Sequence, residues 1–285
     1  MSGERLGAAG LVMVGVVSVQ LGAAVATTVF DELGPGGAVF LRTLFAAAVL
    51  LAIWRPVRGS LEGATLRDVL AFGFVLAAMN CFFFLALDRL PLGIAVTLEF
   101  TGPLAVAIGT SRRPLDLLWT ALAAAGILLL APDIGDGLSA AGVIFALTAG
   151  GFWGAYILLS SRVGRGPAGR AGLAVAMGFA TILLLPIGIA DGGGELLEPR
   201  LVAIGVVIAM LSSAIPYLVE MEALRRLPAG TFGVLLSMEP AFAALVGLIA
   251  LDQSLLDREL AAIALIVLAS AGALSTEPAV EAAEA

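Results

Sequence analysis

The sequence predicts an all-α integral membrane protein with ten transmembrane helices arranged as two inverted repeats of five helices. The first observation is composition: hydrophobic residues make up 60% of the 285 residues and charged residues 13%. A soluble domain has roughly 45–50% and 25% of these classes. The second observation is a duplication within the chain, and the third is the distribution of arginines between the loops. The apolar runs lack the strand-type alternation of a membrane barrel.

The duplication is visible in two stretches of similar sequence. LDRLPLGIAVTLEFTGPLAVA begins at Leu87, and LRRLPAGTFGVLLSMEPAFAA begins at Leu224. Their shared arginine, leucine, proline, glycine and second proline are each separated by 137 residues, as in Arg89 and Arg226. An internal repeat of this length is typical of a two-repeat membrane protein.

Ten apolar segments are bounded by glycine, proline and charged residues. The first is too long for the core of a signal peptide, so we expect it to be a spanning helix. The expected helices cover residues 8–30, 35–54, 66–87, 91–111, 114–131, 139–160, 168–190, 201–224, 228–251 and 256–275. We place the first repeat at 6–133, the second at 138–275 and a disordered cytoplasmic tail at 276–285.

The arginines predict the orientation. With the N-terminus inside, eleven arginines fall on the cytoplasmic side and three, Arg89, Arg200 and Arg258, on the opposite side. The positive-inside rule therefore places both termini in the cytoplasm. Because each repeat has an odd number of helices, the two halves must insert in opposite orientations.

Composition also excludes several classes of function. The net charge is −7 and the arginines are scattered, which argues against nucleic-acid binding. Histidine is absent and Cys81 is the single cysteine, so neither a disulfide within the chain nor a transition-metal site is expected. The chain has no lysine either, so we expect no catalytic nucleophile–base pair and no enzyme. The loops leave no room for an ATP-binding module.

Each repeat holds a glutamate within an apolar run, Glu99 in the first and Glu239 in the second. An ionisable group at the bilayer centre costs about 2.5–3.5 kcal/mol or more, so each needs a reason. Pro103 removes a backbone donor one turn after Glu99, which leaves carbonyl acceptors beside the carboxylate. This setting suits an ammonium group or a coupling proton. The alternative is a structural role, for example pairing of Glu99 with Arg42.

The predicted helix 201–224 is the most polar span. Ser213, Tyr217 and Glu220 share one helix face, and Glu220 is a further candidate for proton coupling. Tyr217 falls opposite Asn80 in the repeat, so both halves place a hydrogen-bonding group at the same point. Such a pair suits the polar backbone groups of an amino acid, while hydrogen bonding between helices is the structural alternative.

Further candidates come from other spans. Gln20 is the strongly polar residue at depth in the first helix, and we assign it to the substrate's polar groups. Trp153, Tyr156 and Met238 are candidates for the pocket that holds the substrate side chain, with packing as the alternative. Arg42 either neutralises a carboxylate or lies near the outer headgroups. The candidate hinge residues are prolines at paired positions of the repeats: Pro91, Pro103, Pro228 and Pro240.

The motifs PLGIAVTLEFTGPLAVA, SRRPLD, IPYLVEMEALRRLP and SMEPA resemble those of bacterial threonine/homoserine exporters, in the EamA branch of the drug/metabolite transporter superfamily. The resemblance runs over about residues 6–275, and LEFTGPLAVA with SRRPLD is its more specific part. It implies the drug/metabolite transporter fold, the bacterial inner membrane and efflux of small neutral amino acids such as threonine and homoserine. Relatives also export methionine and aromatic amino acids. No cofactor and no ATP are implied.

We therefore expect an amino-acid exporter that works by alternating access around a central cavity, with the lipid bilayer and its substrate as partners and a monomer sufficient. Proton antiport and facilitated diffusion both remain open. The alternative within the superfamily is an exporter of another metabolite, a drug or a nucleotide sugar, which would need more arginine to meet phosphates than Arg42 provides.

Overall fold

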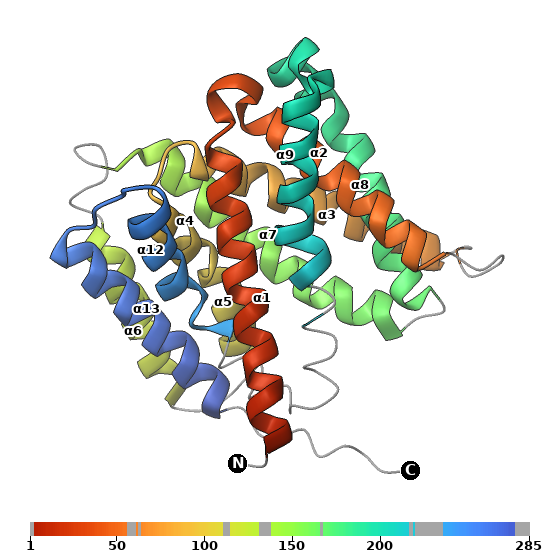
Figure 1. Cartoon of the computed structure of the whole chain (residues 1–285). Helices are drawn as coiled ribbons and strands as arrows, with labels where there is room; N and C mark the ends of the chain where they lie inside the picture. Colours follow the sequence, from red (N-terminus) through yellow and green to blue (C-terminus); the bar gives the residue numbers. More distant parts are fainter. Residues whose placement is uncertain are drawn as a thin grey trace, which may run out of the picture.

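The computed structural model describes residues 3–55, 61, 64–110, 115–130, 138–165, 168–216, 219 and 236–276. The elements of these ranges form a bundle of helices (Figure 1). They are α1 (Gly3–Thr27), α2 (Phe30–Ile53), α3 (Ala64–Leu87), α4 (Leu92–Glu99), α5 (Thr101–Thr110), α6 (Leu115–Leu130), α7 (Ala140–Arg165), α8 (Gly169–Gly192), η2 (Gly193–Leu197), α9 (Pro199–Ala209), η3 (Met210–Ala214), α12 (Glu239–Ala250) and α13 (Asp257–Thr276).

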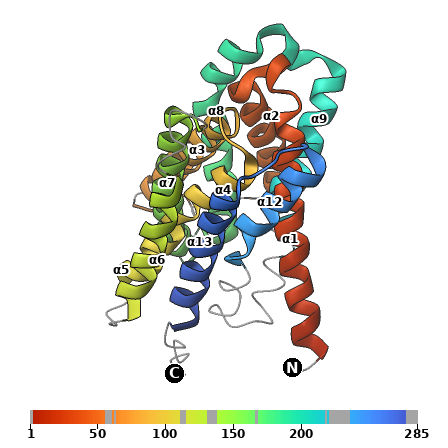
Figure 2. The same cartoon turned by 90° about the vertical axis from the view of Figure 1, so that its left-hand side faces the viewer.

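Five of the described helices are long and apolar enough to cross a membrane. They contain the spans Ala9–Thr27, Phe30–Ile53, Thr65–Leu87, Ala140–Ser160 and Gly169–Leu197. Three further apolar helical stretches among the described residues are shorter: Leu92–Val106, Pro199–Ala214 and Glu239–Ala250. The N-terminal end of α1 and the C-terminal end of α13 lie at the same end of the bundle (Figure 2). The chain is a multi-pass membrane protein.

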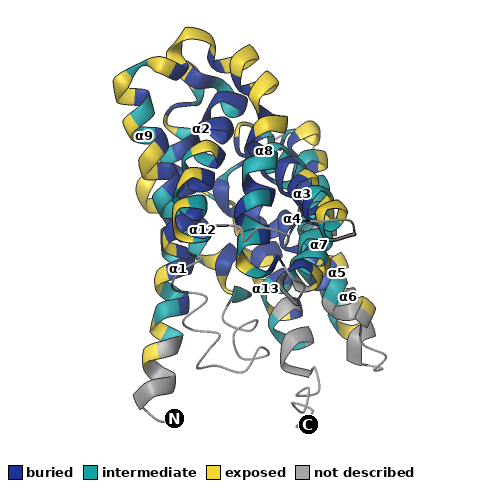
Figure 3. Cartoon of the chain, turned by 90° about the vertical axis from the view of Figure 1, so that its right-hand side faces the viewer, coloured by how far each residue is buried: buried dark blue, intermediate teal, exposed yellow. Residues whose placement is uncertain are grey.

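Helices from the first half of the chain pack mainly against helices from the second half. α2 packs on α8, α3 on α7, α4 on α12 and α6 on α13. One apolar core lies between α2, α3 and α8, and a second surrounds α4. Buried positions gather on the inner faces of the helices, while exposed ones lie on the outside (Figure 3). Many of the exposed side chains are large and apolar, such as Ile182, Ile249 and Phe74, as expected for surfaces that face lipid.

α2 begins five residues earlier than the predicted helix 35–54. Its first turn starts at Phe30, and the helix kinks at Gly34, whose φ of +63° and ψ of 166° are non-helical. Pro35 follows the kink as the first residue of the regular helix, a position where its missing N–H costs nothing. The glycine and proline therefore mark a kink inside the element rather than its beginning.

Two further predicted spans are interrupted. The predicted helix 91–111 divides into α4 and α5 at Phe100, because Pro103 cannot donate to the carbonyl of Glu99. The predicted helix 201–224 changes from α-helix to π-helix at Met210. Such π segments inside α-helices occur frequently at functional sites. Both interruptions lie beside the polar residues described next.

Candidate substrate-binding site

A set of polar side chains is buried inside the apolar bundle. Each needs a polar partner or a ligand, because an unpaired polar group away from water is costly. Those that bear on the site are Gln20 on α1, Asn80 on α3, Glu99 at the end of α4, Ser212 and Ser213 on η3, and Glu239 at the start of α12. Arg42, near the midpoint of α2, is partly buried among them.

Arg42 joins three helical elements. Its Nη1 donates to Oδ1 of Asn80, and its Nη2 donates to the backbone carbonyl of Ser212 at 3.2 Å. The guanidinium carbon also lies 5.5 Å from the centre of the Phe84 ring, in the geometry of a cation–π contact. Arg42, in the middle of a spanning helix, thus contacts groups from both halves of the chain.

The carbonyl of Ser212 is available to Arg42 because of a proline. In a regular α-helix this carbonyl would accept from the N–H four residues later, but that residue is Pro216, which has none. The π-helical turn adds a second departure, since the N–H of Ile215 bonds to the carbonyl of Met210 five residues earlier. The local sequence therefore releases a backbone acceptor toward α2.

Asn80 is fixed by hydrogen bonds within the protein. Its Nδ2 donates to the carbonyl of Leu76 at 2.7 Å, and its Oδ1 accepts from Arg42. The side chain is 4% exposed. Asn80 was predicted to bind polar groups of the substrate, and this role stays a prediction; in this structure its amide contacts Arg42 and the backbone of its own helix.

Glu99 is 8% exposed and closes α4. Its backbone carbonyl, released by Pro103, lies against α7, where a Cβ on Gly150 would come within 2.6 Å of the oxygen. The end of α4 and its released carbonyl are therefore packed closely against α7 inside the bundle.

The two aromatic candidates on α7 contact different neighbours. Trp153 packs edge-on against Phe100, with ring centroids 5.2 Å apart, so it lies beside the α4–α5 break. Tyr156 packs against Phe72 of α3, with centroids 5.3 Å apart, and belongs to the core around α2, α3 and α8. Trp153 therefore contacts the residue that follows Glu99, whereas Tyr156 contacts α3.

Gln20 is 1% exposed, and within the described ranges nothing lies at hydrogen-bonding distance from its Oε1. It follows Val12 and Val16 at a spacing of four residues, so it continues the α1 stripe that packs on Phe242 of α12. Ser213 is 1% exposed on η3, and α1 contacts the same element through a hydrogen bond from Ser18 Oγ to the carbonyl of Leu211 at 2.7 Å.

The remaining candidates are placed only in part. Glu239 is 7% exposed and begins α12, with Pro240 in its first turn, and Met238 just before it is 41% exposed. Pro91 precedes α4, and Pro103 lies in α5. Three candidates, Tyr217, Glu220 and Pro228, lie outside the described residues. In the described part of the chain, no three metal-ligating side chains gather into a group that could hold a metal ion.

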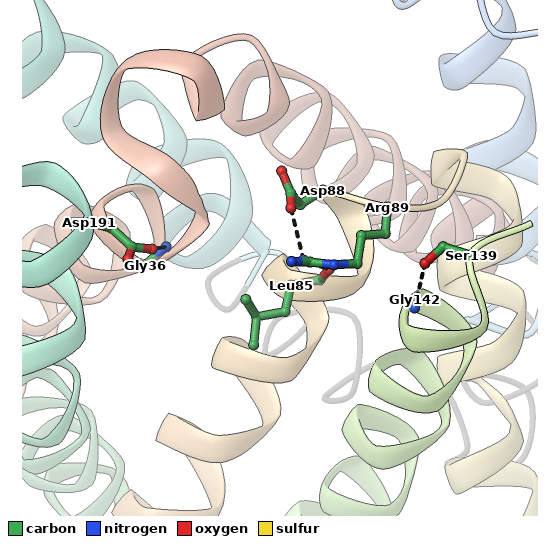
Figure 4. A network of polar contacts seen from close by, with 7 residues as sticks. All are labelled: Gly36, Leu85, Asp88, Arg89, Ser139, Gly142 and Asp191. Carbon is green, nitrogen blue, oxygen red and sulfur yellow. Dashed lines mark hydrogen bonds and ion pairs between the residues drawn. The ribbon is translucent and has the colours of Figure 1, made fainter.

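The end of the bundle opposite the start of α1 is held by polar contacts (Figure 4). Oδ2 of Asp191, at the end of α8, accepts from the N–H of Gly36 at 2.9 Å, just after the kink in α2. Arg89 pairs with Asp88 at 2.8 Å and donates to the carbonyl of Leu85. The first and second halves of the chain are thus connected at this end as well as in the middle.

Several known proteins are similar to this chain. The threonine/homoserine exporters RhtA of Escherichia coli K12 and Salmonella typhimurium LT2 are 40% identical over 269 residues, covering 93% of this chain and 90% of theirs. The uncharacterized transporter YwfM of Bacillus subtilis is 28% identical over 78% of both chains. A solved crystal structure of a protein 20% identical to this one superposes with a TM-score of 0.61 over 93% of this chain and 96% of that chain, so the fold is shared.

The model of the EamA-like transporter family matches residues 140–275, the second of the two predicted repeats. The relatives cover both predicted repeats at an identity that ordinarily preserves fold and family. The chain therefore belongs to the EamA-like transporter family.

Proposed function

We propose that this protein exports small neutral amino acids, threonine and homoserine foremost, across the bacterial inner membrane. The observation that carries the proposal is the 40% identity to threonine/homoserine exporters along nearly the whole chain. Charged and polar side chains at the centre of the bundle agree with it, because intramembrane ionisable groups mark substrate or ion pathways.

The architecture proposed for transport is a pair of inverted five-helix repeats, 6–133 and 138–275, with a further tail at 276–285. The helix pairing supports it. If α2 and α6 correspond to α8 and α13, each packs against its own counterpart, and α4 packs on α12, which corresponds to α5 of the same predicted span. In the same correspondence, α1 matches α7, and α3 matches α9 together with η3. The contact of α3 with α7 is therefore equivalent to the contact of α1 with α9 and η3. Rocking of one repeat against the other around a fixed site is the usual basis of alternating access.

For orientation, we propose that both termini are cytoplasmic. The positive-inside rule favours this side, and the ends of α1 and α13 lie at one end of the bundle, as two cytoplasmic termini require. The end with Asp191 and Arg89 would then face the periplasm.

For the site, we propose that Glu99 receives the substrate ammonium group or a coupling proton, with Glu239 and Glu220 as further proton carriers. Gln20, Asn80, Ser213 and Tyr217 would bind the polar groups of the substrate. Trp153, Tyr156 and Met238 would shape the side-chain pocket. Bends at Pro91, Pro103, Pro228 and Pro240 would let the helices rock.

Uptake into proteoliposomes tests the function. Labelled threonine, methionine and phenylalanine are offered with and without an imposed pH gradient. Accumulation above equilibrium that requires the gradient would indicate proton antiport, whereas equilibration that ignores it would indicate a facilitator. No movement of any amino acid would refute the proposal.

Glu99→Gln tests the role of the carboxylate. Loss of a charge-assisted contact should lower threonine uptake by on the order of ten-fold or more. Glu195→Gln, an exposed position on η2, is the matched control. Wild-type uptake by Glu99→Gln at equal expression would remove Glu99 from the site.

A further inference from the structure

We infer that Gln20 is the residue that recognises the side-chain hydroxyl of the transported amino acid. The inference rests on the proposed function and deepens it, because it names the group by which the site distinguishes a hydroxylated amino acid from an apolar one of the same shape. Threonine and homoserine, the two compounds in the names of the similar exporters, both carry a hydroxyl on a short side chain. Gln20 is thereby assigned to one group of the substrate rather than to its polar groups in general.

The first argument is the state of the Gln20 amide. The side chain is 1% exposed, and its Oε1 is buried with no hydrogen-bond partner among the described residues. A buried acceptor without a donor carries the cost of its lost hydration, and lipid tails supply no donor to replace water. A ligand that brings an O–H or N–H group to this oxygen removes the cost. The amide is therefore suited to bind a donor from outside the chain.

The second argument is the face of α1 on which Gln20 lies. One turn before it, Val16 belongs to an apolar cluster that includes part of α12, and one turn after it, Ala24 belongs to the core around α4. Gln20 therefore lies on the face of α1 that is turned toward α4 and α12. These two helices hold the buried side chains of Glu99 and Glu239, the carboxyl groups proposed for the site.

The opposite face of α1 carries a polar contact of a structural kind. Ser18 and Gly22, each two residues from Gln20, lie toward η3. Oγ of Ser18 donates to the carbonyl of Leu211 at 2.7 Å, and a Cβ on Gly22 would clash with the same element. Because two residues turn an α-helix through about 200°, this contact lies on the far side of the helix from Gln20. Hydrogen bonding between α1 and η3 thus does not explain a buried amide at position 20.

The third argument is charge. A zwitterionic amino acid has a cationic ammonium group and an anionic carboxylate, and each of these needs an opposite charge when it leaves water. A neutral amide supplies none, whereas a neutral hydroxyl needs only a hydrogen-bond acceptor. The stripe neighbours Val16 and Ala24 are apolar, which suits the carbon atoms of the same substrate side chain. The hydroxyl is therefore the group of the substrate that Gln20 matches best.

Pairs of substrate analogues of equal shape provide the test. Valine has a methyl group where threonine has its hydroxyl, and norvaline is related to homoserine in the same way. Each unlabelled compound competes with labelled threonine for uptake into proteoliposomes. The wild type should prefer the hydroxylated member of each pair by about 10- to 100-fold, because the apolar analogue leaves the amide without a donor. Gln20→Met, which keeps the length of the side chain but not the acceptor, should reduce both preferences by about ten-fold or more.

Thermal denaturation separates recognition from a structural role. Because Oε1 has no partner among the described residues, Gln20→Met without substrate should denature at the wild-type temperature or above it. Ser18→Ala, on the opposite face of α1, is the matched control. It removes a hydrogen-bonded hydroxyl, so it should lower the denaturation temperature and leave both preferences unchanged. A lower denaturation temperature for Gln20→Met with unchanged preferences would mean that Gln20 is structural, and it would refute the inference.

A second variant keeps the test decisive if Gln20→Met does not fold. Gln20→Asn retains the amide but withdraws it by one methylene group. Homoserine carries its hydroxyl one methylene group further from the α-carbon than threonine does, so it compensates for the shorter side chain. The ratio of the inhibition constants should therefore shift by about five-fold or more in favour of homoserine. An unchanged ratio in the folded variant would contradict contact between Gln20 and the hydroxyl.

The outcomes distinguish this inference from the proposed function. If the variants change the preferences as stated, Gln20 binds the hydroxyl. If the wild type transports threonine but does not distinguish it from valine, or if Gln20→Met keeps the wild-type preference, the role of Gln20 is refuted and the exporter proposal survives. If the wild type transports no amino acid, the exporter proposal fails and the inference fails with it.

Discussion

A pair of neighbouring glycines on α7 offers a sharp test of how the helices at the site pack. Gly150 lies against α4, where a Cβ would come within 2.6 Å of the carbonyl oxygen of Glu99. Gly151, the next residue, has no atom within 4 Å of the same virtual Cβ. The two positions share a helix, a residue type and nearly the same depth, but they differ in what a methyl group would meet.

The structure gives a magnitude for each substitution. Ordinary contact begins near 3.4 Å, so Gly150→Ala must move α7 from the α4–α5 break by about 0.8 Å, the difference between 3.4 and 2.6 Å. Because backbone lies on the far side, no flexible side chain can yield, and overpacking of this kind costs about 1–3 kcal/mol. Gly151→Ala meets open space and should gain about 0.5–1 kcal/mol from helix propensity.

The assay is thermal denaturation of the purified variants in detergent, together with threonine uptake at equal expression. Gly150→Ala should denature at a lower temperature than the wild type, and Gly151→Ala at the same or a higher temperature. Uptake should fall with Gly150→Ala, because the displaced carbonyl belongs to Glu99 and Trp153 packs on the adjacent Phe100. Equal stability of the two variants would refute the packing of α7 on the α4–α5 break.

Two further predictions concern helix starts. Asp191→Ala removes the acceptor for the Gly36 N–H at the start of the regular part of α2, and it should lower the free energy of unfolding by about 1–2 kcal/mol. Glu195→Ala, exposed on η2, serves as the control, and identical denaturation temperatures of both variants would show that this hydrogen bond does not stabilise α2. Gln253→Leu leaves the N–H of Leu92 without the Oε1 that accepts from it at 2.9 Å and should cost about 1–2 kcal/mol. Gln253→Glu keeps an acceptor there, so it should denature near the wild type; equal losses in both variants would mean that the hydrogen bond is not what stabilises α4.

The spans could be predicted from sequence because their signal is local. A run of apolar residues between charged or proline-containing turns needs no knowledge of neighbours, and α3, α7 and α8 match the predicted spans closely at most of their ends. The kink at Gly34 was harder to predict from sequence, since Gly34 and Pro35 indicate a break but do not show whether a helix precedes it. The acidic first turn of α2, with Asp31 and Glu32, favours a helix start before the kink.

The candidate site was predictable in its parts but not in its connections. Glu99 and Gln20 could be singled out because polar groups are rare in spanning helices, and both are buried. The contacts of Arg42 depend on where α2, α3 and η3 meet, which no single segment encodes. One local signal was present: Pro216 deprives Ser212 of its helical donor, so a free carbonyl at Ser212 could have been predicted from the spacing alone.

The polar residues of the bundle do not follow the predicted repeat. Under the 137-residue correspondence Arg42 stands opposite Phe179, and Glu99 stands opposite Leu236. A strict duplication would bury a second arginine and a second glutamate in the spans, each at a further cost of about 2.5–3.5 kcal/mol or more. If the two predicted repeats rock between equivalent states, their helices need similar lengths and packing, whereas the residues of the site need not repeat. The predicted duplication is therefore compatible with a site whose charged residues differ between the two halves.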